Sequence, residues 1–275
     1  MGTCGWRRRG PSSGALAPRP GNAYNTLVLA AHALQLDGVS KLFGGLRAVD
    51  AVSLAVQPGE RRALIGPNGA GKTTLFNLIA GTFPVTHGTI RLFGEDVTGM
   101  AAHRRAWAGL SRTFQVSNLF PTLSVLENCL LAVQALTPAR LAMHRPLRGY
   151  PDLHARARAT LEAVGLADRA ADVVRQLSHG EQRQLEIGLA LAGTPRLLLL
   201  DEPTAGLSPA ESHHMAQLLG TLDPAMTVLI IEHDMDIALE VARQVTVLHY
   251  GRVIADGTRD EIRAHPLVRE IYLGA

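Results

Sequence analysis

Aromatic side chains are scarce in this chain of 275 residues, which has 6 Phe, 4 Tyr and 2 Trp. Aliphatic residues must therefore fill the core, and a protein that stacks bases on an aromatic face is hard to build from this set. Long apolar runs are also missing, since none approaches the roughly 18 residues of a membrane-spanning helix. The apolar fraction of 47% and the charged fraction of 19% still predict a folded chain, because disordered chains have the opposite balance.

Cysteine and lysine are rare as well. The two cysteines, Cys4 and Cys129, form no metal-binding or redox spacing, which indicates a reducing compartment. The chain has 25 arginines but only two lysines, Lys41 and Lys72, so each lysine raises the question of what an ammonium group does there that a guanidinium cannot. The net charge of +3 comes from four arginines that precede residue 37. The rest of the chain is nearly neutral, and no nucleic-acid partner is expected.

Two regions differ in composition. Residues 1–33 are expected to be a disordered extension rather than a signal peptide, because a Pro/Gly spacer separates the basic cluster from the apolar segment. Over 34–275, short aliphatic runs alternate with helical patterns, which predicts one α/β domain. The expected strands are Ala51–Val56, Arg61–Ile65, Thr89–Phe93, Leu197–Leu200, Thr227–Ile231, Val245–His249 and Arg252–Ala255. Several are continuous apolar runs, typical of central strands buried on both faces, and the last two flank a hairpin turn.

The middle of the chain, about residues 111–193, has helical periodicity and almost no strand signal. Two capping boxes, Ser124 with Glu127 and Ser178 with Glu181, mark helix starts there. We therefore expect a doubly wound core that is interrupted by a helical subdomain.

A glycine-rich loop carries the strongest chemical signal. Residues 66–73 fit the phosphate-loop pattern G-x-x-x-x-G-K-[ST], between an expected strand and an expected helix. Backbone N–H groups of such a loop and the helix N-terminus face phosphate oxygens, while Lys72 reaches the β- and γ-phosphates and Thr73 offers its hydroxyl to Mg²⁺. The expected ATP-binding residues of this loop are Gly66, Pro67, Asn68, Gly69, Ala70, Gly71, Lys72, Thr73 and Thr74.

Two acidic residues follow a second buried strand. Asp201 and Glu202 come directly after Leu197–Leu200, at the carboxyl edge of the expected sheet, where ligands of such folds bind. Asp201 is expected to hold Mg²⁺, and Glu202 to polarise the attacking water.

The order of motifs resembles that of ATP-binding cassette (ABC) ATPases over residues 34–275. Leu177 to Gln182 is similar to the LSGGQ signature, and Gln115 and His233 match the Q-loop glutamine and the switch histidine of that family. Phe43 fits the aromatic residue that stacks on adenine. The resemblance implies a P-loop NTPase (RecA-like) core with an inserted helical subdomain and an antiparallel β portion.

The resemblance also implies a mechanism and partners. Two cassettes pair head to tail, so that each ATP lies between one phosphate loop and the other chain's signature residues, here Ser178, His179, Gly180 and Glu181. Glu202 and His233 then act on the terminal phosphate, and Gln115 contacts the metal with Thr73 and Asp201 and links the site to the helical subdomain. The implied partners are a second ATPase subunit, with a heterodimer favoured over a homodimer, and two permease subunits. An extracytoplasmic binding protein acts indirectly.

Two residues depart from the family pattern. His179 replaces the first glycine of the signature, and Ser208 stands where many members have aspartate. Ser208 and Glu211 form a further capping box, so the local structure is expected to persist.

Three segments are similar to the ATPases of branched-chain amino acid importers, namely residues 112–128, 182–187 and 268–274. The implied function is ATP hydrolysis that powers uptake of these amino acids, at the cytoplasmic face of the inner membrane as a peripheral subunit. Urea or amide import and lipopolysaccharide export are the alternatives, and a non-transport ABC ATPase is a more distant one.

Overall fold

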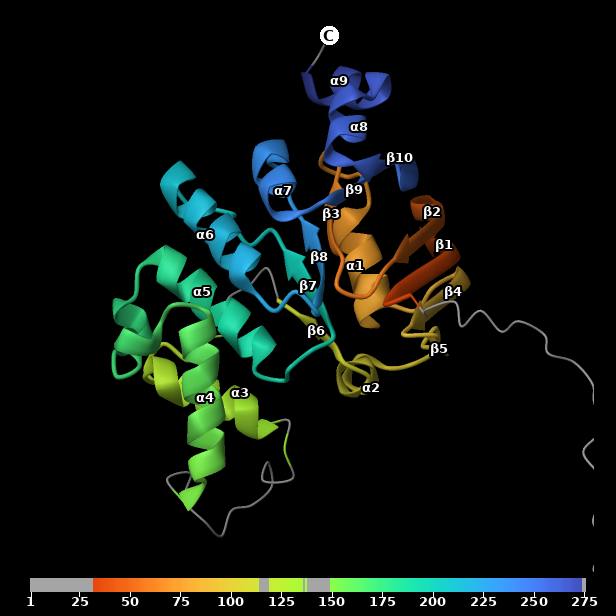
Figure 1. Cartoon of the computed structure of the whole chain (residues 1–275). Coiled ribbons are helices and arrows are strands. Elements are labelled where there is room, and N and C mark those ends of the chain that lie inside the picture. The colour runs from red at the N-terminus through yellow and green to blue at the C-terminus, as the bar shows by residue number, and fades with distance from the viewer. Residues whose placement is uncertain (1–31, 114–118, 136, 138–148, 274–275) are drawn as a thin grey trace, which may run out of the picture. The chain divides into compact units, whose positions relative to one another are not determined.

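The computed structural model describes residues 32–113, 119–135, 137 and 149–273, and the statements below refer to them (Figure 1). The expected extension over residues 1–33 lies outside the described residues up to residue 31. Ala33 does not belong to an extension, because it is fully buried and donates its N–H to Val56 O at 2.9 Å.

A six-stranded sheet forms the centre of the domain. Its strand order is β10-β9-β3-β8-β7-β6, and all neighbours are parallel except the β9–β10 hairpin. Its strands are β3 (Arg61–Ile65), β6 (Leu110–Arg112), β7 (Leu197–Asp201), β8 (Thr227–Ile231), β9 (Gln244–His249) and β10 (Arg252–Thr258). The hairpin turn has Tyr250 at φ 45° and Gly251 at φ 77°, the left-handed pair that a tight two-residue turn requires.

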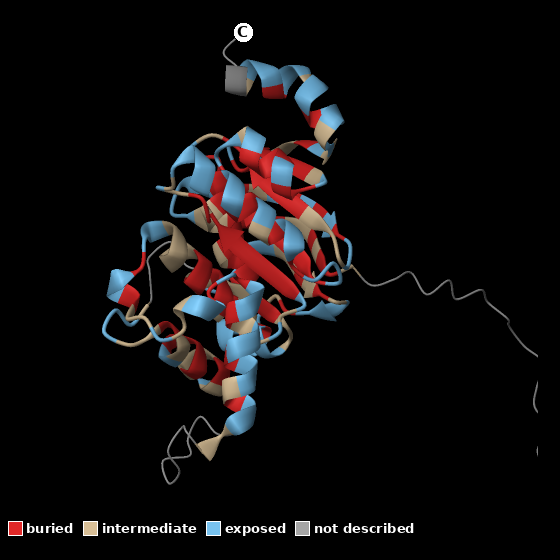
Figure 2. Cartoon of the chain, turned by 60° about the vertical axis from the view of Figure 1, so that its left-hand side comes forward, coloured by how far each residue is buried: buried red, intermediate tan, exposed pale blue. Residues whose placement is uncertain are grey.

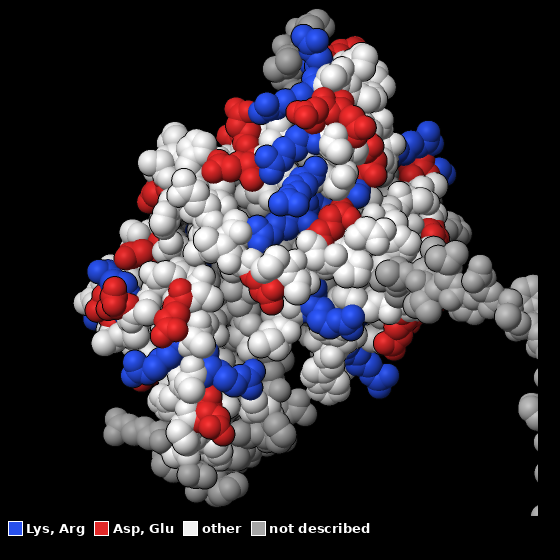
Figure 3. Space-filling model, viewed as in Figure 1, with Lys and Arg blue, Asp and Glu red and all other residues white. Residues whose placement is uncertain are grey.

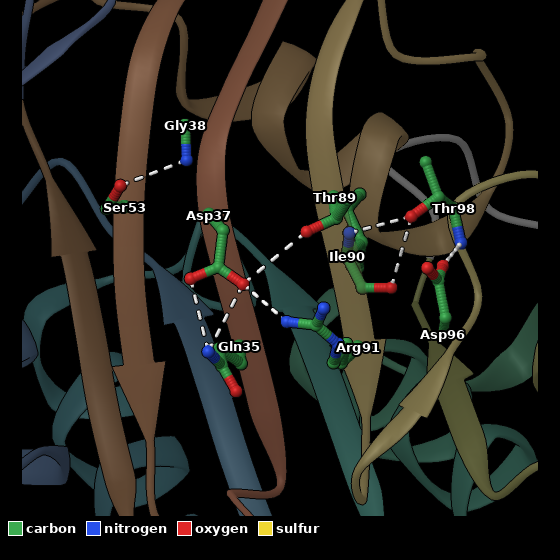
Figure 4. A network of polar contacts seen from close by, with 9 residues as sticks. All are labelled: Gln35, Asp37, Gly38, Ser53, Thr89, Ile90, Arg91, Asp96 and Thr98. Atoms are coloured by element: carbon green, nitrogen blue, oxygen red, sulfur yellow. Dashed lines mark hydrogen bonds and ion pairs between the residues drawn. The ribbon is translucent and has the colours of Figure 1, made fainter.

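A second sheet is antiparallel and has the order β2-β1-β4-β5. Its strands are β1 (Leu34–Phe43), β2 (Leu46–Val56), β4 (His87–Leu92) and β5 (Glu95–Asp96). Figure 4 shows the polar contacts that join β1 to β4: Asp37 of β1 accepts hydrogen bonds from Thr89 at 3.4 Å and from Arg91 at 2.7 Å, both on β4. Such cross-strand pairs fix the register of the sheet.

Helices cover both faces of the central sheet. The helices of the described residues are α1 (Lys72–Ala80), α2 (Ala102–Trp107), α3 (Val125–Ala135), α4 (Pro151–Ala163), α5 (His179–Leu191), α6 (Pro209–Thr221), α7 (Met235–Val241), α8 (Arg259–Ala264) and α9 (Pro266–Leu273), with 3₁₀ turns η3 (Ala167–Arg169) and η4 (Val174–Gln176). Among the described residues, no helix has the length and apolarity needed to cross a membrane.

Successive residues of β7 belong to two different cores. Leu197 and Leu199 pack in a cluster with α1 and the antiparallel sheet, whereas Leu198 and Leu200 pack in a cluster with α3 to α7. Burial on both faces explains why this strand is a continuous apolar run (Figure 2).

The expected helical subdomain contains α3, α4 and α5, which lie together at one end of the domain (Figure 1). Its expected start near residue 111 falls within β6, since Ser111 and Arg112 pair with β7. The capping boxes at Ser178 and Ser208 are present as expected.

Basic and acidic side chains lie close together over α7 and α8 on the face drawn in Figure 3. This mixture agrees with the nearly neutral charge of the chain beyond its first residues.

Candidate functional site

The glycine-rich loop connects β3 to α1 and is clamped between two sheets. A Cβ at Gly66 (φ 155°) would lie 2.2 Å from Leu248 O in β9, and one at Gly71 (φ 101°) would lie 2.4 Å from Ala48 O in β2. Both positions therefore require glycine, because any side chain would collide with backbone. The loop places the first N–H groups of α1 toward the cavity described next.

A cavity of about 490 Å³ opens over this loop. Its lining residues are Leu46, Arg47, Ala48, Asn68, Gly69, Ala70, Gly71, Lys72, Thr73, Thr74, Glu202, Tyr250 and Gly251. Sequence reasoning missed the residues from β2 and from the β9–β10 turn, since only the fold brings them beside the loop.

The Lys72 side chain is buried within the loop. Its Nζ donates to Gly66 O at 2.5 Å and to Pro67 O at 3.1 Å. Burial lowers the pKa of this amine, while the carboxylates of Glu202 and Asp201 raise it. The ammonium group thus lies at the N-terminus of α1, close to two carboxylates. A helix N-terminus with a lysine is a favourable site for a phosphate group.

Asp201 ends β7 with a fully buried carboxyl group. Arg112 of the neighbouring β6 donates to Asp201 Oδ2 at 2.8 Å and to Asn77 Oδ1 at 2.6 Å. Asp201 Oδ1 has no hydrogen-bond partner within the described part of the chain, and burial raises the pKa of the carboxyl against the lowering effect of Arg112. A buried carboxylate oxygen of this kind fits a hard cation that prefers oxygen ligands. Arg112 was not selected from the sequence as a site residue.

Glu202 takes an unusual backbone conformation at the rim of the same cavity. Its φ is 49°, in the left-handed region that side chains rarely adopt, and its N–H donates to Ile231 O at 3.0 Å. Strain of this kind costs about 1–3 kcal/mol and concentrates at functional sites.

His233 follows the adjacent strand β8, and its side chain is 57% exposed. The preceding residue, Glu232, is fully buried and accepts a hydrogen bond from Thr204 Oγ1 at 2.8 Å. Sequence reasoning missed Glu232, although its place at the end of an apolar strand was a signal.

Other expected site residues lie apart from the phosphate loop. Ser178, Gly180 and Glu181 line a separate cavity of about 720 Å³ between α5 and α6. Phe43 ends β1 with its ring edge-on to Phe83 at 5.7 Å, and it does not line the cavity over the loop. Gln115 lies outside the described residues.

His179 fills space beside the turn that precedes α6. A Cβ on Gly206 (φ 79°) would lie 3.1 Å from His179 Cε1, so the imidazole packs directly on this glycine. Ser208 caps α6, and its hydroxyl accepts from the N–H of Glu211.

A parallel sheet with a phosphate loop at its carboxyl edge, followed by acids on a neighbouring strand, defines a P-loop nucleotide-binding domain. Comparison with known proteins gives the family. The pattern of the ABC transporter family matches residues 49–205, and that of the branched-chain amino acid ATP-binding cassette transporters matches residues 252–275. The chain belongs to the ABC transporter family, as an ATP-binding and ATP-hydrolysing subunit.

Known proteins resemble the chain over nearly its whole length. The high-affinity branched-chain amino acid transport ATP-binding protein BraF of Pseudomonas aeruginosa is 39% identical, covering 88% of this chain and 97% of BraF. A crystal structure of an ABC transporter cassette in its ADP conformation is 30% identical with a TM-score of 0.77, covering 89% of this chain and 99% of that one. A dimeric cassette bound to ADP and phosphate is 26% identical with a TM-score of 0.69, covering 82% of this chain and 98% of that one.

Proposed function

We propose that this chain hydrolyses ATP to drive uptake of branched-chain amino acids through membrane permeases. The observation that carries the substrate class is the 39% identity to BraF over 88% of the chain, together with the C-terminal match over residues 252–275. The cassette comprises residues 34–275, and the helical part near residues 111–193 carries the signature.

The nucleotide occupies the cavity over the phosphate loop. The backbone N–H groups of residues 68–74 and the Lys72 ammonium bind its phosphates, and the buried ion pair with Arg112 holds Asp201 in place. Mg²⁺ is proposed at Asp201 Oδ1 and the Thr73 hydroxyl, and Gln115 is proposed as a further ligand. When bound, Mg²⁺ offsets the phosphate charge, and it is held by few protein oxygens together with those of the nucleotide.

Glu202 is proposed to orient the attacking water, because its carboxylate lines the cavity on a strained, fixed backbone. His233 is proposed to contact the terminal phosphate of ATP, and the Phe43 ring is proposed to stack on the adenine base.

The signature residues Ser178, His179, Gly180 and Glu181 are proposed to act on the nucleotide of a second cassette, since Ser178, Gly180 and Glu181 line a different cavity from the loop. The dimeric relative with ADP and phosphate supports such pairing. A heterodimer is favoured, with two permease subunits above it, an extracytoplasmic binding protein and a place at the cytoplasmic face of the membrane.

Glu202→Gln tests the catalytic assignment. The variant is expected to bind ATP like the unchanged chain but to lose steady-state turnover, because the amide cannot accept the proton of water. Fluorescent-nucleotide binding and phosphate release measure the two properties. Retained turnover at the unchanged rate removes Glu202 from this role.

The substrate class is tested in proteoliposomes that contain the chain with its co-purified permeases and binding protein. ATP-dependent uptake of labelled leucine is expected. Uptake of urea but not of leucine contradicts the proposal and favours urea or amide import. Co-purification with lipopolysaccharide-export components favours lipopolysaccharide export.

A further inference from the structure

Glu232 is a buried carboxyl group that the proposed function does not yet use. It lies between the end of β8 and His233, and its side chain is 0% exposed. Oε1 accepts hydrogen bonds from Thr204 Oγ1 at 2.8 Å and from Thr204 N at 3.3 Å. Oε2 is buried and has no hydrogen-bond partner among the residues that the structure describes. A buried carboxyl oxygen without a partner is costly, so it requires an explanation.

The unpartnered oxygen faces the neighbouring imidazole. Glu232 Oε2 and His233 Nδ1 lie 3.9 Å apart, which is beyond a hydrogen bond. The two side chains differ in freedom, because Thr204 holds the carboxyl whereas the imidazole is 57% exposed. A rotation of the exposed ring therefore closes the gap without movement of the buried group. Catalytic hydrogen bonds are often long in this way before the reactive complex forms.

We propose that Glu232 is a positioning residue for His233: its free Oε2 forms a hydrogen bond with Nδ1 and leaves the Nε2–H donor for the terminal phosphate. The inference rests on the proposed role of His233 and adds a residue to it. The same carboxyl group holds the N–H and hydroxyl of Thr204, two residues after Glu202. One side chain thus ties the loop of the histidine to the turn of the catalytic acid.

Protonation supports the pairing. Burial raises the pKa of the Glu232 carboxyl, against the lowering effect of the Thr204 hydrogen bonds. A carboxyl with a raised pKa and an imidazole share one proton readily. Whether that proton is bonded to Oε2 or to Nδ1, the ring keeps its Nε2–H as a donor.

The decisive experiment compares Glu232→Leu in two backgrounds of the full chain. In the unchanged chain, the substitution is expected to lower single-turnover hydrolysis by about 10²-fold, the usual effect of misplacing a catalytic group by 1 Å. The dissociation constant for ATP is expected to stay within about twofold, because Glu232 does not line the cavity over the phosphate loop. In a His233→Ala background, Glu232→Leu is expected to have a much smaller further effect, because the imidazole that it positions is gone and only its hydrogen bonds with Thr204 remain to be lost.

Two matched variants separate positioning from support of the fold. Glu232→Gln is expected to retain most of the turnover, since its amide oxygen accepts from Thr204 and its amide N–H donates to Nδ1. Thr204→Val removes the hydroxyl bond and keeps the histidine contact, so its loss is expected to be smaller than that of Glu232→Leu. Equal losses from Glu232→Leu in both backgrounds, or from Thr204→Val and Glu232→Leu, overturn the inference.

A spectroscopic measurement needs no destabilising variant. With a non-hydrolysable ATP analogue and Mg²⁺, the ¹⁵N spectrum of histidine-labelled chain is expected to show His233 protonated at Nε2 and hydrogen-bonded at Nδ1. A ring that lacks the Nε2 proton contradicts the inference. If His233→Ala leaves turnover unchanged, the proposed role of His233 fails as well, whereas a loss in His233→Ala without one in Glu232→Leu overturns only the inference about Glu232.

Discussion

Replacement of Arg112 by methionine tests how the buried acid of the site is held. Arg112 is 9% exposed and donates to Asp201 Oδ2 at 2.8 Å and to Asn77 Oδ1 at 2.6 Å, while the Asp201 side chain is 0% exposed. Removing one partner of a buried ion pair leaves an uncompensated charge and costs about 3–5 kcal/mol. Because domains have about 5–15 kcal/mol of stability, Arg112→Met is expected to fold at neutral pH with a much lower urea midpoint.

The loss of unfolding free energy in Arg112→Met is expected to increase with pH. Burial raises the pKa of Asp201 above its unfolded value, so its contribution to stability falls as the pH rises through the folded pKa. Arg112 lowers that pKa, and its removal moves the folded pKa further upward. The difference in unfolding free energy between Arg112→Met and the unchanged chain is therefore expected to be larger at pH 7 than at pH 5.

A double variant provides the control. In Arg112→Met with Asp201→Asn, the side chain at position 201 is neutral, so no uncompensated buried charge remains; the loss is expected to be about 1–3 kcal/mol, from the hydrogen bonds of Arg112 and the buried amide that lacks them. Urea unfolding followed by circular dichroism at both pH values measures all three proteins. A loss below 1 kcal/mol for Arg112→Met at pH 7, or an equal loss at pH 5 and 7, refutes the reasoning.

Three further predictions concern the phosphate loop, the signature and the buried thiol. Lys72→Arg is expected to weaken ATP binding by about 2 kcal/mol, because a planar guanidinium does not fit the loop and a hydrogen bond to a charged group is lost; unchanged affinity by fluorescence titration contradicts this. Gly206→Ala is expected to cost about 1 kcal/mol less in a His179→Gly background, where the contact at 3.1 Å is gone; additive urea-unfolding losses would show that the two residues do not couple. Burial raises the pKa of the Cys129 thiol to about 12, so in a Cys4→Ser background iodoacetamide at pH 8 is expected to modify the chain only after unfolding; mass spectrometry that finds rapid native modification rules this out.

Strands with a single strong signal could be located from the sequence. Arg61–Ile65 and Thr227–Ile231 have the expected bounds, because each ends in a short apolar run and is buried over nearly its whole length. β1 over Leu34–Phe43 was missing from the expected strands. Its pairing with β2 has several register shifts, which interrupt the alternation of polar and apolar residues.

Within the site, local motifs were recognisable and contacts between distant segments were not. The phosphate loop and the acids after β7 each lie within one continuous segment. Arg112 meets Asp201 only because β6 is the neighbour of β7, and strand order is not written in local periodicity. Glu232 was overlooked for the same reason, since its partner Thr204 follows a different strand.

The clamping of the phosphate loop between the two sheets has a consequence for how the chain is made. The loop spans residues 66–73, yet one of its glycines is wedged against Leu248 O, and Gly251 N–H donates to Ala70 O at 2.9 Å. A ribosome must therefore synthesise more than 170 residues beyond the loop before the loop can make its native contacts with β9 and the β9–β10 turn. A nascent chain that lacks the β9–β10 hairpin has no complete phosphate site, so ATP stabilises the finished cassette and gives no help to its folding intermediates.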